Sequence, residues 1–283
     1  MNTIQHSVRL GFRRGWLEAR QMMTNWEDLF NTFLYPAIFV IVMFFMRDAK
    51  LPGMEFSVGA ATVPSVLGAS IVFTGMLGMA GVLAVEREDG TLLRAKATPN
   101  GMIGYLVGKV VTVSMSTVIG MLLVLIPSLI LFDGIAPGGL TSWLGLLWVL
   151  VLGLLATMPI GAIFGSLTSN ARSIGLIMLP TLGIGAISGI FYPITALPEW
   201  LQYLGQVFPM YWLGLGMRSA LLPDSTVAIE IGQSWRPWET LGVLSVWAVI
   251  GLTLAPVVLR RMARRESGSS VAARREKAMQ RIG

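Results

Sequence analysis

The densest group of chemically capable side chains in this sequence is a charged run that follows a long apolar stretch. Six charged residues occur between Glu86 and Lys96, and Pro99 and Gly101 follow them. Leucines inside the run supply a small apolar side, which predicts a short helix that the proline stops. Charges of both signs on such a helix could form ion pairs with a soluble partner. A solvated connecting loop fits the same composition.

Groups that could make or break covalent bonds are scarce. The sequence has no cysteine and one histidine, His6, which excludes thiol catalysis and cysteine-ligated zinc. The nearest approach to a phosphate-binding loop is residues 104–110, but its glycine spacing is wrong and no Ser or Thr follows Lys109. We therefore expect no catalytic residue, metal ligand or cofactor site in this chain. Energy for uphill transport would have to come from a partner.

The elements that must position the charged run are membrane-spanning helices. Of 283 residues, 54% are hydrophobic and 13% are charged, whereas soluble domains carry about 25% charged residues. A spanning helix needs about 20 mostly apolar residues. Six segments qualify: 29–46, 58–85, 107–132, 143–167, 173–192 and 240–259. The sequence thus predicts an all-α integral membrane protein with six transmembrane helices.

The distribution of lysine and arginine predicts the orientation. Seventeen of the 21 basic residues fall on one side of the six spans, in segment 1–28, the loops after the second and fourth spans, and the tail 260–283. Basic residues concentrate in cytoplasmic segments, so we expect both termini in the cytoplasm. These flanks explain the net charge of +6 without a nucleic-acid partner, and they favour contact with membrane lipids.

Two further segments are expected to lie beside the spans. In 1–28, apolar residues recur at helical spacing, which predicts an amphipathic helix in the membrane interface, either as an anchor or as a lever that touches a partner. Its apolar face comprises Val8, Phe12, Trp16, Ala19, Met23 and Trp26. Segment 193–222 is apolar but interrupted by prolines, so we expect short re-entrant helices there.

The centres of the six expected spans hold no Asp, Glu, Lys or Arg. Charged groups at that depth usually mark ion or proton pathways. Their absence argues against a proton-coupled transporter and, because no nucleophile–base pair is present, against a membrane enzyme.

Two motifs resemble the membrane subunit of ABC-2 type transporters. That family has an ERExGTLxRLxATP-like stretch after its second span, and this chain has a similar stretch from Glu86 to Pro99, followed by Gly108 and Lys109. After its fifth span the family has an SGxxxP…LPxWLQ…P…R pattern. The chain matches that pattern at Ser188, Gly189, Tyr192, Pro193, Leu197, Pro198, Pro209 and Arg218. Bacterial drug-export permeases of the daunorubicin-resistance type are the subgroup that it resembles most.

The resemblance implies a transmembrane domain over 29–259 in the bacterial plasma membrane. A second permease copy or a sister permease would complete the complex, together with an ABC ATPase subunit that binds ATP and Mg²⁺. Loop 86–101 would be a coupling helix that docks on the ATPase. Its expected docking residues are Glu86, Arg87, Glu88, Gly90, Thr91, Arg94 and Pro99.

The resemblance also assigns the far side of the domain. Segment 193–222 would cap the translocation path from outside, with Arg218 and Glu199 either locking it or meeting departing substrate. The second and fifth spans would line the path at the dimer interface. Glycines allow close helix approach there, although packing within the chain is the other role for each of them: Gly75, Gly78, Gly81, Gly185 and Gly189.

We therefore expect a permease subunit that exports an amphipathic or hydrophobic, drug-like molecule from the cytoplasm or the inner leaflet. Export of a lipid or a polysaccharide is the alternative within the family, and an ion-coupled secondary transporter is the alternative from another class. The docking hypothesis predicts that Glu86→Ala, or charge reversal at Arg87, uncouples transport without preventing membrane insertion.

Overall fold

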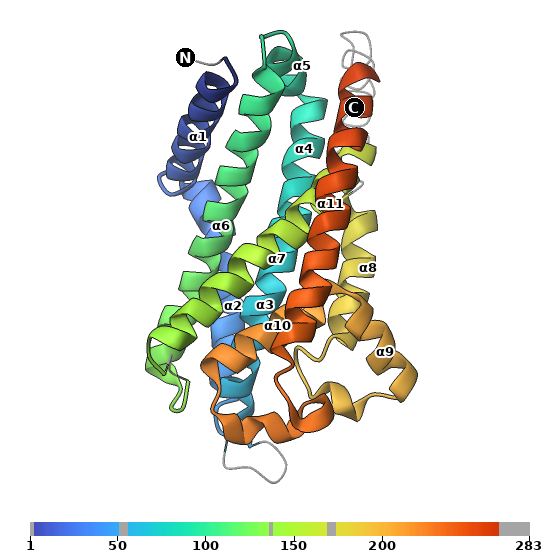
Figure 1. Cartoon of the computed structure of the whole chain (residues 1–283). Coiled ribbons are helices and arrows are strands. Elements are labelled where there is room, and N and C mark those ends of the chain that lie inside the picture. The colour runs from blue at the N-terminus through green and yellow to red at the C-terminus, as the bar shows by residue number, and fades with distance from the viewer. Residues whose placement is uncertain (1–2, 51–55, 136–137, 169–173, 266–283) are drawn as a thin grey trace, which may run out of the picture.

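The computed structural model describes residues 3–50, 56–135, 138–168 and 174–265. Within these ranges the chain folds into a bundle of helices (Figure 1). The α-helices are α1 (Thr3–Met22), α2 (Trp26–Phe45), α3 (Val58–Val72), α4 (Met79–Glu88), α5 (Thr91–Lys96), α6 (Gly101–Leu131), α7 (Leu140–Leu167), α8 (Ile174–Ile187), α9 (Glu199–Val207), α10 (Pro209–Leu221) and α11 (Pro237–Arg265). A π-helical turn, η1 (Phe73–Gly78), joins α3 to α4, and 3₁₀ turns form η3 (Ile194–Ala196), η4 (Asp224–Ile229) and η5 (Ile231–Gln233).

Among the described residues, five stretches of helix are long and apolar enough to cross a membrane: α2, the continuous stretch Val58–Glu88, α6, α7 and α11. They correspond to five of the six expected spans. The expected fifth span corresponds to α8, of which 14 residues are described; these rise about 21 Å, less than the roughly 30 Å of a hydrocarbon core. The all-helical membrane class is therefore confirmed, whereas the six-span count is not. Part of that expected span, together with 169–172, lies outside the described residues.

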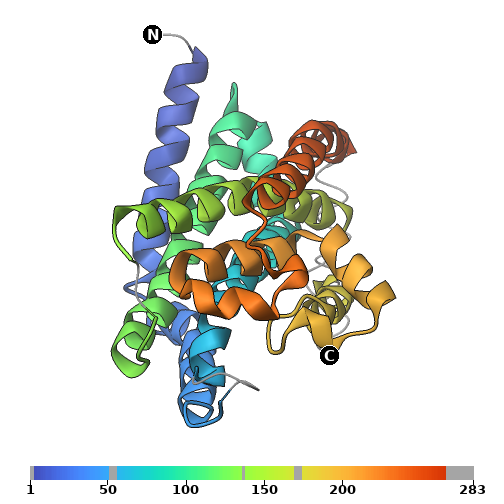
Figure 2. The ribbon, with the colours of Figure 1, turned by 60° about the horizontal axis from the view of Figure 1, so that its bottom comes forward.

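The bundle has two distinct ends. One end carries α5, and both the start of α1 and the end of α11 lie there (Figure 1). We call it the α5 end. The opposite end carries α9 and the 3₁₀ turns, and Figure 2 shows α10 with the segment after it lying across that end. Helix α11 continues to Arg265, so the first residues of the expected tail 260–283 are helical; 266–283 lie outside the described residues.

Helix α10 forms the core of the half opposite α5. All of its residues except Ser219 are buried, and it packs against α3, α7 and α11. The contact with α3 is close because two glycines meet: a Cβ on Gly68 would lie 2.5 Å from the backbone nitrogen of Gly214. The short helices expected in 193–222 are thus present as η3, α9 and α10, and the last of them is a packed core helix.

The N-terminal helix is present, but it packs differently from the expectation. Most of the apolar face is turned outward, with Phe12 and Trp16 55% and 51% exposed. Ala19, a member of the expected apolar face, is buried instead, together with Gly11 and Gly15. That small-residue face lies lengthwise on α6 and runs in the same direction (Figure 1). Small residues at four-residue spacing let α1 follow α6 closely, and the expected position of α1 in the membrane interface stays a prediction.

The closeness of α1 and α6 depends on glycines in both helices. A Cβ on Gly11 would lie 2.3 Å from the carbonyl oxygen of Gly104, and a Cβ on Gly15 would lie 2.4 Å from that of Gly108. No larger side chain fits at either position without moving the backbone. Helix α1 is therefore fixed beside the first turns of α6, close to α5.

Candidate functional site

The charged run forms the turn between α4 and α6 at the α5 end. Helix α4 continues through Glu88, so the first part of the expected loop 86–101 belongs to a span. Gly90 has a φ of +80° and makes the left-handed turn into α5, a conformation that suits glycine. The backbone N–H of Thr91 donates a 2.8 Å hydrogen bond to Oδ1 of Asp89, which satisfies one of the unpaired donors of the new helix.

Helix α5 has one buried side and one exposed side. Leu92 is 1% exposed and packs in a cluster with Leu83 of α4 and Tyr105 of α6. Arg94 and Lys96 are exposed, as are the residues from 97 to 100. The sequence prediction of a short helix is confirmed, and its role as a docking element stays a prediction.

Glu86 and Arg87 bond within the chain, and the expectation that they dock on the ATPase stays a prediction. Arg87 Nη1 donates hydrogen bonds of 2.6 Å to the carbonyl oxygen of Ser166 and 2.5 Å to that of Thr168. These carbonyls lie at the end of α7, where helix geometry leaves them without intrahelical donors. Arg87 thus caps α7 and joins it to α4. Charge reversal at Arg87 would therefore disturb the fold of the permease as well as any docking.

A buried lysine connects three helices beside α5. Lys109 of α6 has a side chain 5% exposed, and its Nζ lies 2.7 Å from Oε2 of Glu18 and 2.5 Å from Oε1 of Glu86. The hydroxyl of Thr112 lies 3.1 Å from the same Glu18 oxygen. We call Glu18, Glu86, Lys109 and Thr112 the Lys109 cluster. The cluster fixes α1 and α4 to α6. Along α6 it lies one to two helical turns after the residues that line the groove described next.

The electrostatics of the Lys109 cluster favour the charged form of Glu18. Burial alone would raise the pKa of the Glu18 carboxyl, but hydrogen bonds from Lys109 and Arg14 outweigh burial and hold this pKa below its ordinary value. Arg14 Nε lies 2.8 Å from Oε1 of Glu18, at an exposed edge of α1. Lys109 is buried together with two carboxylates that pair with it, since an unpaired ammonium there would be costly.

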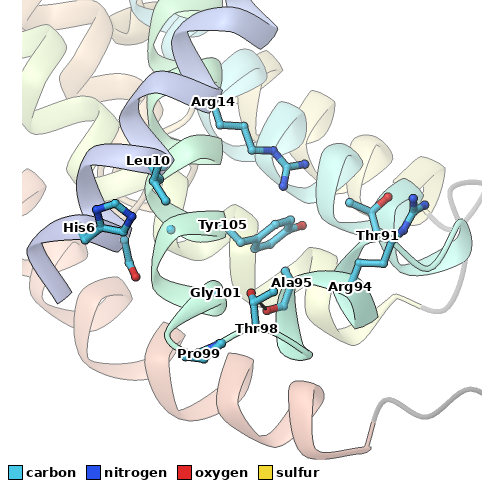
Figure 3. Close-up of a pocket in the computed structure, with 13 residues that line it drawn as sticks. His6, Leu10, Arg14, Thr91, Arg94, Ala95, Thr98, Pro99, Gly101 and Tyr105 are labelled. Atoms are coloured by element: carbon cyan, nitrogen blue, oxygen red, sulfur yellow. Dashed lines mark hydrogen bonds between the residues drawn. The ribbon is translucent and has the colours of Figure 1, made fainter. Parts of the chain in front are cut away.

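A groove of about 610 Å³ opens between α1, α5 and the first turns of α6 (Figure 3). Tyr105 lies between the residues of α1 and those of α5. The polar side chains that line the groove are His6, Ser7, Arg14, Thr91, Arg94 and Thr98.

The opposite end holds a second buried ion pair. Arg218 of α10 has its Nε 2.6 Å from Oε1 of Glu230, and both side chains are 6% exposed. Arg218 Nη1 donates to the hydroxyl of Ser65 on α3 at 2.7 Å and to the carbonyl oxygen of Gly189 at 3.4 Å. We call these four residues the Arg218 cluster. Its carboxylate is Glu230 and not the expected Glu199, and nothing in the local sequence around Glu230 indicated this pairing.

The other residues of the second motif shape the turn after α8. Gly189 adopts a φ of +63°, a region that residues with a Cβ rarely enter. The hydroxyl of Ser188 donates to the carbonyl of Ile184, and that of Tyr192 donates to the carbonyl of Ala186. The remaining members lie at the ends of the next short helices. Pro193, Pro198 and Pro209 mark the starts of η3, α9 and α10, and Leu197 caps the end of η3.

The five glycines singled out from the sequence divide into two groups. A Cβ on Gly75 would lie 2.6 Å from Oγ1 of Thr157, so this glycine serves packing within the chain. Gly185 and Gly189 likewise contact side chains of the same chain. A Cβ on Gly81 would meet nothing within 4 Å, and a Cβ on Gly78 would meet only a methyl of the preceding turn. Of these five glycines, Gly78 and Gly81 are therefore the two that face open space among the described residues.

A scan against protein families matches residues 52–256 to the model described as an ABC-2 family transporter protein. The match covers more than two thirds of the chain and runs from just before α3 into α11. The chain belongs to the ABC-2 transporter family. A comparison with curated proteins found no match.

Membership of the ABC-2 family identifies the chain as a multi-pass membrane subunit of an ABC transporter. Such a subunit has no ATPase site of its own, and the family implies an ABC ATPase as partner. The matched region contains α5, Lys109 and the Arg218 cluster, whereas α1 lies outside it. The Lys109 cluster therefore joins the ABC-2 domain to an additional N-terminal helix.

Proposed function

We propose that this chain is the permease of an ATP-driven exporter in the bacterial plasma membrane, with the α5 end in the cytoplasm. A separate ATPase would bind ATP and Mg²⁺ and dock on α5. The observation that carries the proposal is the construction of α5, which exposes one side and is buried on the other at the junction of α4 and α6. An element of this kind can move only together with the helices to which it is fixed.

Helices α3 and α4, joined by η1, form a continuous path across the bundle along which a displacement of α5 could pass. Val58–Glu88 is one unbroken helical stretch, and its far half packs against α10. Glu86, in its last turn, is fixed to α6 and α1 by Lys109. Movement imposed at α5 would therefore reach the Ser65–Arg218 contact at the other end.

Two permease copies, or this chain and a sister permease, would enclose the path. The open positions Gly78 and Gly81 support this arrangement, because they leave room for the backbone of another helix. Helix α8 lies beside them and exposes apolar side chains, with Leu176 and Leu179 75% and 70% exposed. Packing between copies on this face would bury both features.

The proposed substrate is an amphipathic or hydrophobic molecule of the kind that the resembled drug exporters move. Lipid or polysaccharide export is the alternative within the family. The family assignment favours ATP-driven transport over the ion-coupled alternative, since the implied partner is an ATPase.

The docking proposal can be tested with single cysteines, because the chain has none of its own. Ala97→Cys places a thiol on the exposed end of α5, and Tyr203→Cys, at a site 72% exposed on α9, is the matched control at the opposite end. Each variant would carry a thiol-linked photo-crosslinker and be co-expressed with the candidate ATPase. We expect covalent capture of the ATPase from position 97 and not from position 203.

The outcomes of this experiment separate two errors. Capture from position 203 alone would overturn the proposed orientation. Capture from neither position, with both variants present in the membrane at the normal level, would overturn α5 as the docking element.

A further inference from the structure

The groove at the α5 end has the size of a ligand site and brings three elements of the chain together. Its volume of about 610 Å³ lies in the range of about 300–1,000 Å³ that is typical of ligand sites. Three elements form its walls, namely α1, α5 and the first turns of α6 (Figure 3). A molecule bound in it would contact α1 and α5 at the same time.

The polar lining of the groove favours an anion. Arg14 comes from α1 and Arg94 from α5, and His6 and two threonine hydroxyls add further donors. None of the described residues that line the groove carries a carboxylate; Glu18, which pairs with Arg14 through Nε, does not line it. Guanidinium groups bind phosphate oxygens in a bidentate manner, which makes arginine pairs suited to phosphate groups.

The position of the groove along α6 places it at the level of lipid head groups. Helix α6 has 31 residues and rises about 46 Å, which exceeds the roughly 30 Å of the hydrocarbon core. Its first turns, including Gly101 and Gly104, line the groove and precede its long apolar middle part. They are therefore the part of α6 that extends into the head-group region.

The outward face of α1 provides a surface for acyl chains next to the groove. Phe12, Trp16 and Leu17 are 55%, 51% and 57% exposed, and Leu10 of the same helix lines the groove itself. Tryptophan is enriched at the membrane–water interface. An acidic protein segment would match the arginines but not this apolar face, so the surroundings favour a lipid.

We propose that the groove binds the phosphate head group of an anionic phospholipid from the adjoining leaflet, with Arg14 and Arg94 as its ligands. The lipid would join α5 to α1 directly, in addition to the indirect link through Lys109. The idea extends the proposed function, because it makes the position of the docking helix depend on lipid composition. The binding itself requires neither the ATPase nor a particular orientation.

Native mass spectrometry of the full-length chain in detergent would test the binding. The probes are phosphatidylglycerol and phosphatidylcholine with identical acyl chains, and the variant is R14Q/R94Q. The control R13Q/K96Q removes the same charge from the same two helices at positions that do not line the groove. We expect a preference for phosphatidylglycerol that weakens about thirtyfold in R14Q/R94Q and by less than about twofold in the control.

Two results would overturn the proposal. One is equal binding of the two lipids, or equal weakening in both double variants. The other is measured by thiol labelling of Thr98→Cys in nanodiscs. The lipid proposal requires slower labelling with phosphatidylglycerol than with phosphatidylcholine, so equal labelling rates would overturn it. Labelling that slows only on addition of the ATPase would assign the groove to the protein partner. Crosslinking from position 97 tests the docking proposal separately, so failure of one proposal is distinguishable from failure of the other.

Discussion

The two buried ion clusters of this permease are built on opposite plans. The Arg218 cluster pairs one cation with one carboxylate, 12 residues apart and both 6% exposed, and a serine and a carbonyl use a second arm of the guanidinium. The Lys109 cluster places one cation between two carboxylates from two other helices, with side chains 23% and 14% exposed. The first is closed, with a carboxylate that is near the cation in sequence, whereas the second is partly open to solvent and takes its two carboxylates from two other helices.

The difference indicates what each cluster can tolerate. A charge left alone in the Arg218 cluster has little access to water, so it keeps the full cost of burial. The carboxylates of the Lys109 cluster can gain water if the lysine is lost, and Glu18 retains Arg14. We therefore expect the Arg218 cluster to be needed for stability, and the Lys109 cluster to govern how α1 and α4 are held at α6.

The largest effect is expected from Arg218→Met. The substitution leaves Glu230 buried without its cation, which should lower the free energy of unfolding by about 3–5 kcal/mol. The measurement is the unfolding temperature of the purified chain in detergent. Arg47→Met is the matched control, since Arg47 is 49% exposed and its loss should cost about 1 kcal/mol or less.

The double variant R218M/E230M sharpens this prediction. Replacing both members of a buried pair by apolar residues is often close to neutral, so it should recover most of the lost stability. If the double variant is as unstable as the single one, the cost arises from Ser65 and Gly189 and not from the unpaired Glu230.

A smaller effect is expected from Lys109→Met, at about 2–3 kcal/mol. Since the lysine holds α1 to α6, hydrogen exchange should rise throughout Thr3–Met22. Arg218→Met should leave exchange in α1 unchanged at a temperature where both variants remain folded. The triple variant E18Q/E86Q/K109M, which removes all three charges, should be more stable than Lys109→Met alone. Equal exchange in α1 for Lys109→Met and Arg218→Met would remove the distinction between the two clusters.

The smallest effect is the dependence on pH that Glu18 gives to the Lys109 cluster. The pKa of Glu18 is lower in the folded chain than its ordinary value of 4.5. Its contribution to stability is therefore complete above pH 4.5 and is lost as the pH falls through the folded-state value. Glu18→Gln should flatten the stability profile below pH 4.5 by an amount on the order of 1 kcal/mol or less. A profile that Glu18→Gln does not change would mean that this carboxylate gains nothing from Lys109.

Local signals in the sequence were sufficient for most of the helices. Long apolar runs located α2, α6, α7 and α11 because burial in lipid and helix formation require the same residues. The charges, the leucines and Pro99 located α5. Hydropathy could not show that in the fifth apolar run the helix ends at Ile187 and turns follow, because apolar turns and apolar helices have the same composition.

The packing faces and charge partners were less accessible to sequence reasoning. On α1 the apolar stripe containing Trp16 dominated the pattern, yet it faces outward, and the face that packs is made of Gly11 and Gly15. In a membrane protein, lipid-facing and protein-facing surfaces are both apolar, so periodicity alone does not separate them. Glu18 is 91 residues away from Lys109 in sequence, and the carbonyls that Arg87 binds are about 80 residues away from it. No local pattern encodes pairings over such distances.

The docking of α1 on α6 also sets an order of events during synthesis. Lys109 follows Glu18 by 91 residues, and a ribosome adding about 5–20 residues per second needs roughly 5–20 s to reach it. Until then α1 exists without its glycine-lined neighbour, and Glu18 without its cation. Helix α1 therefore takes its final place only after α2, Val58–Glu88 and the start of α6 have been made, so it is made early and waits for the helix on which it docks.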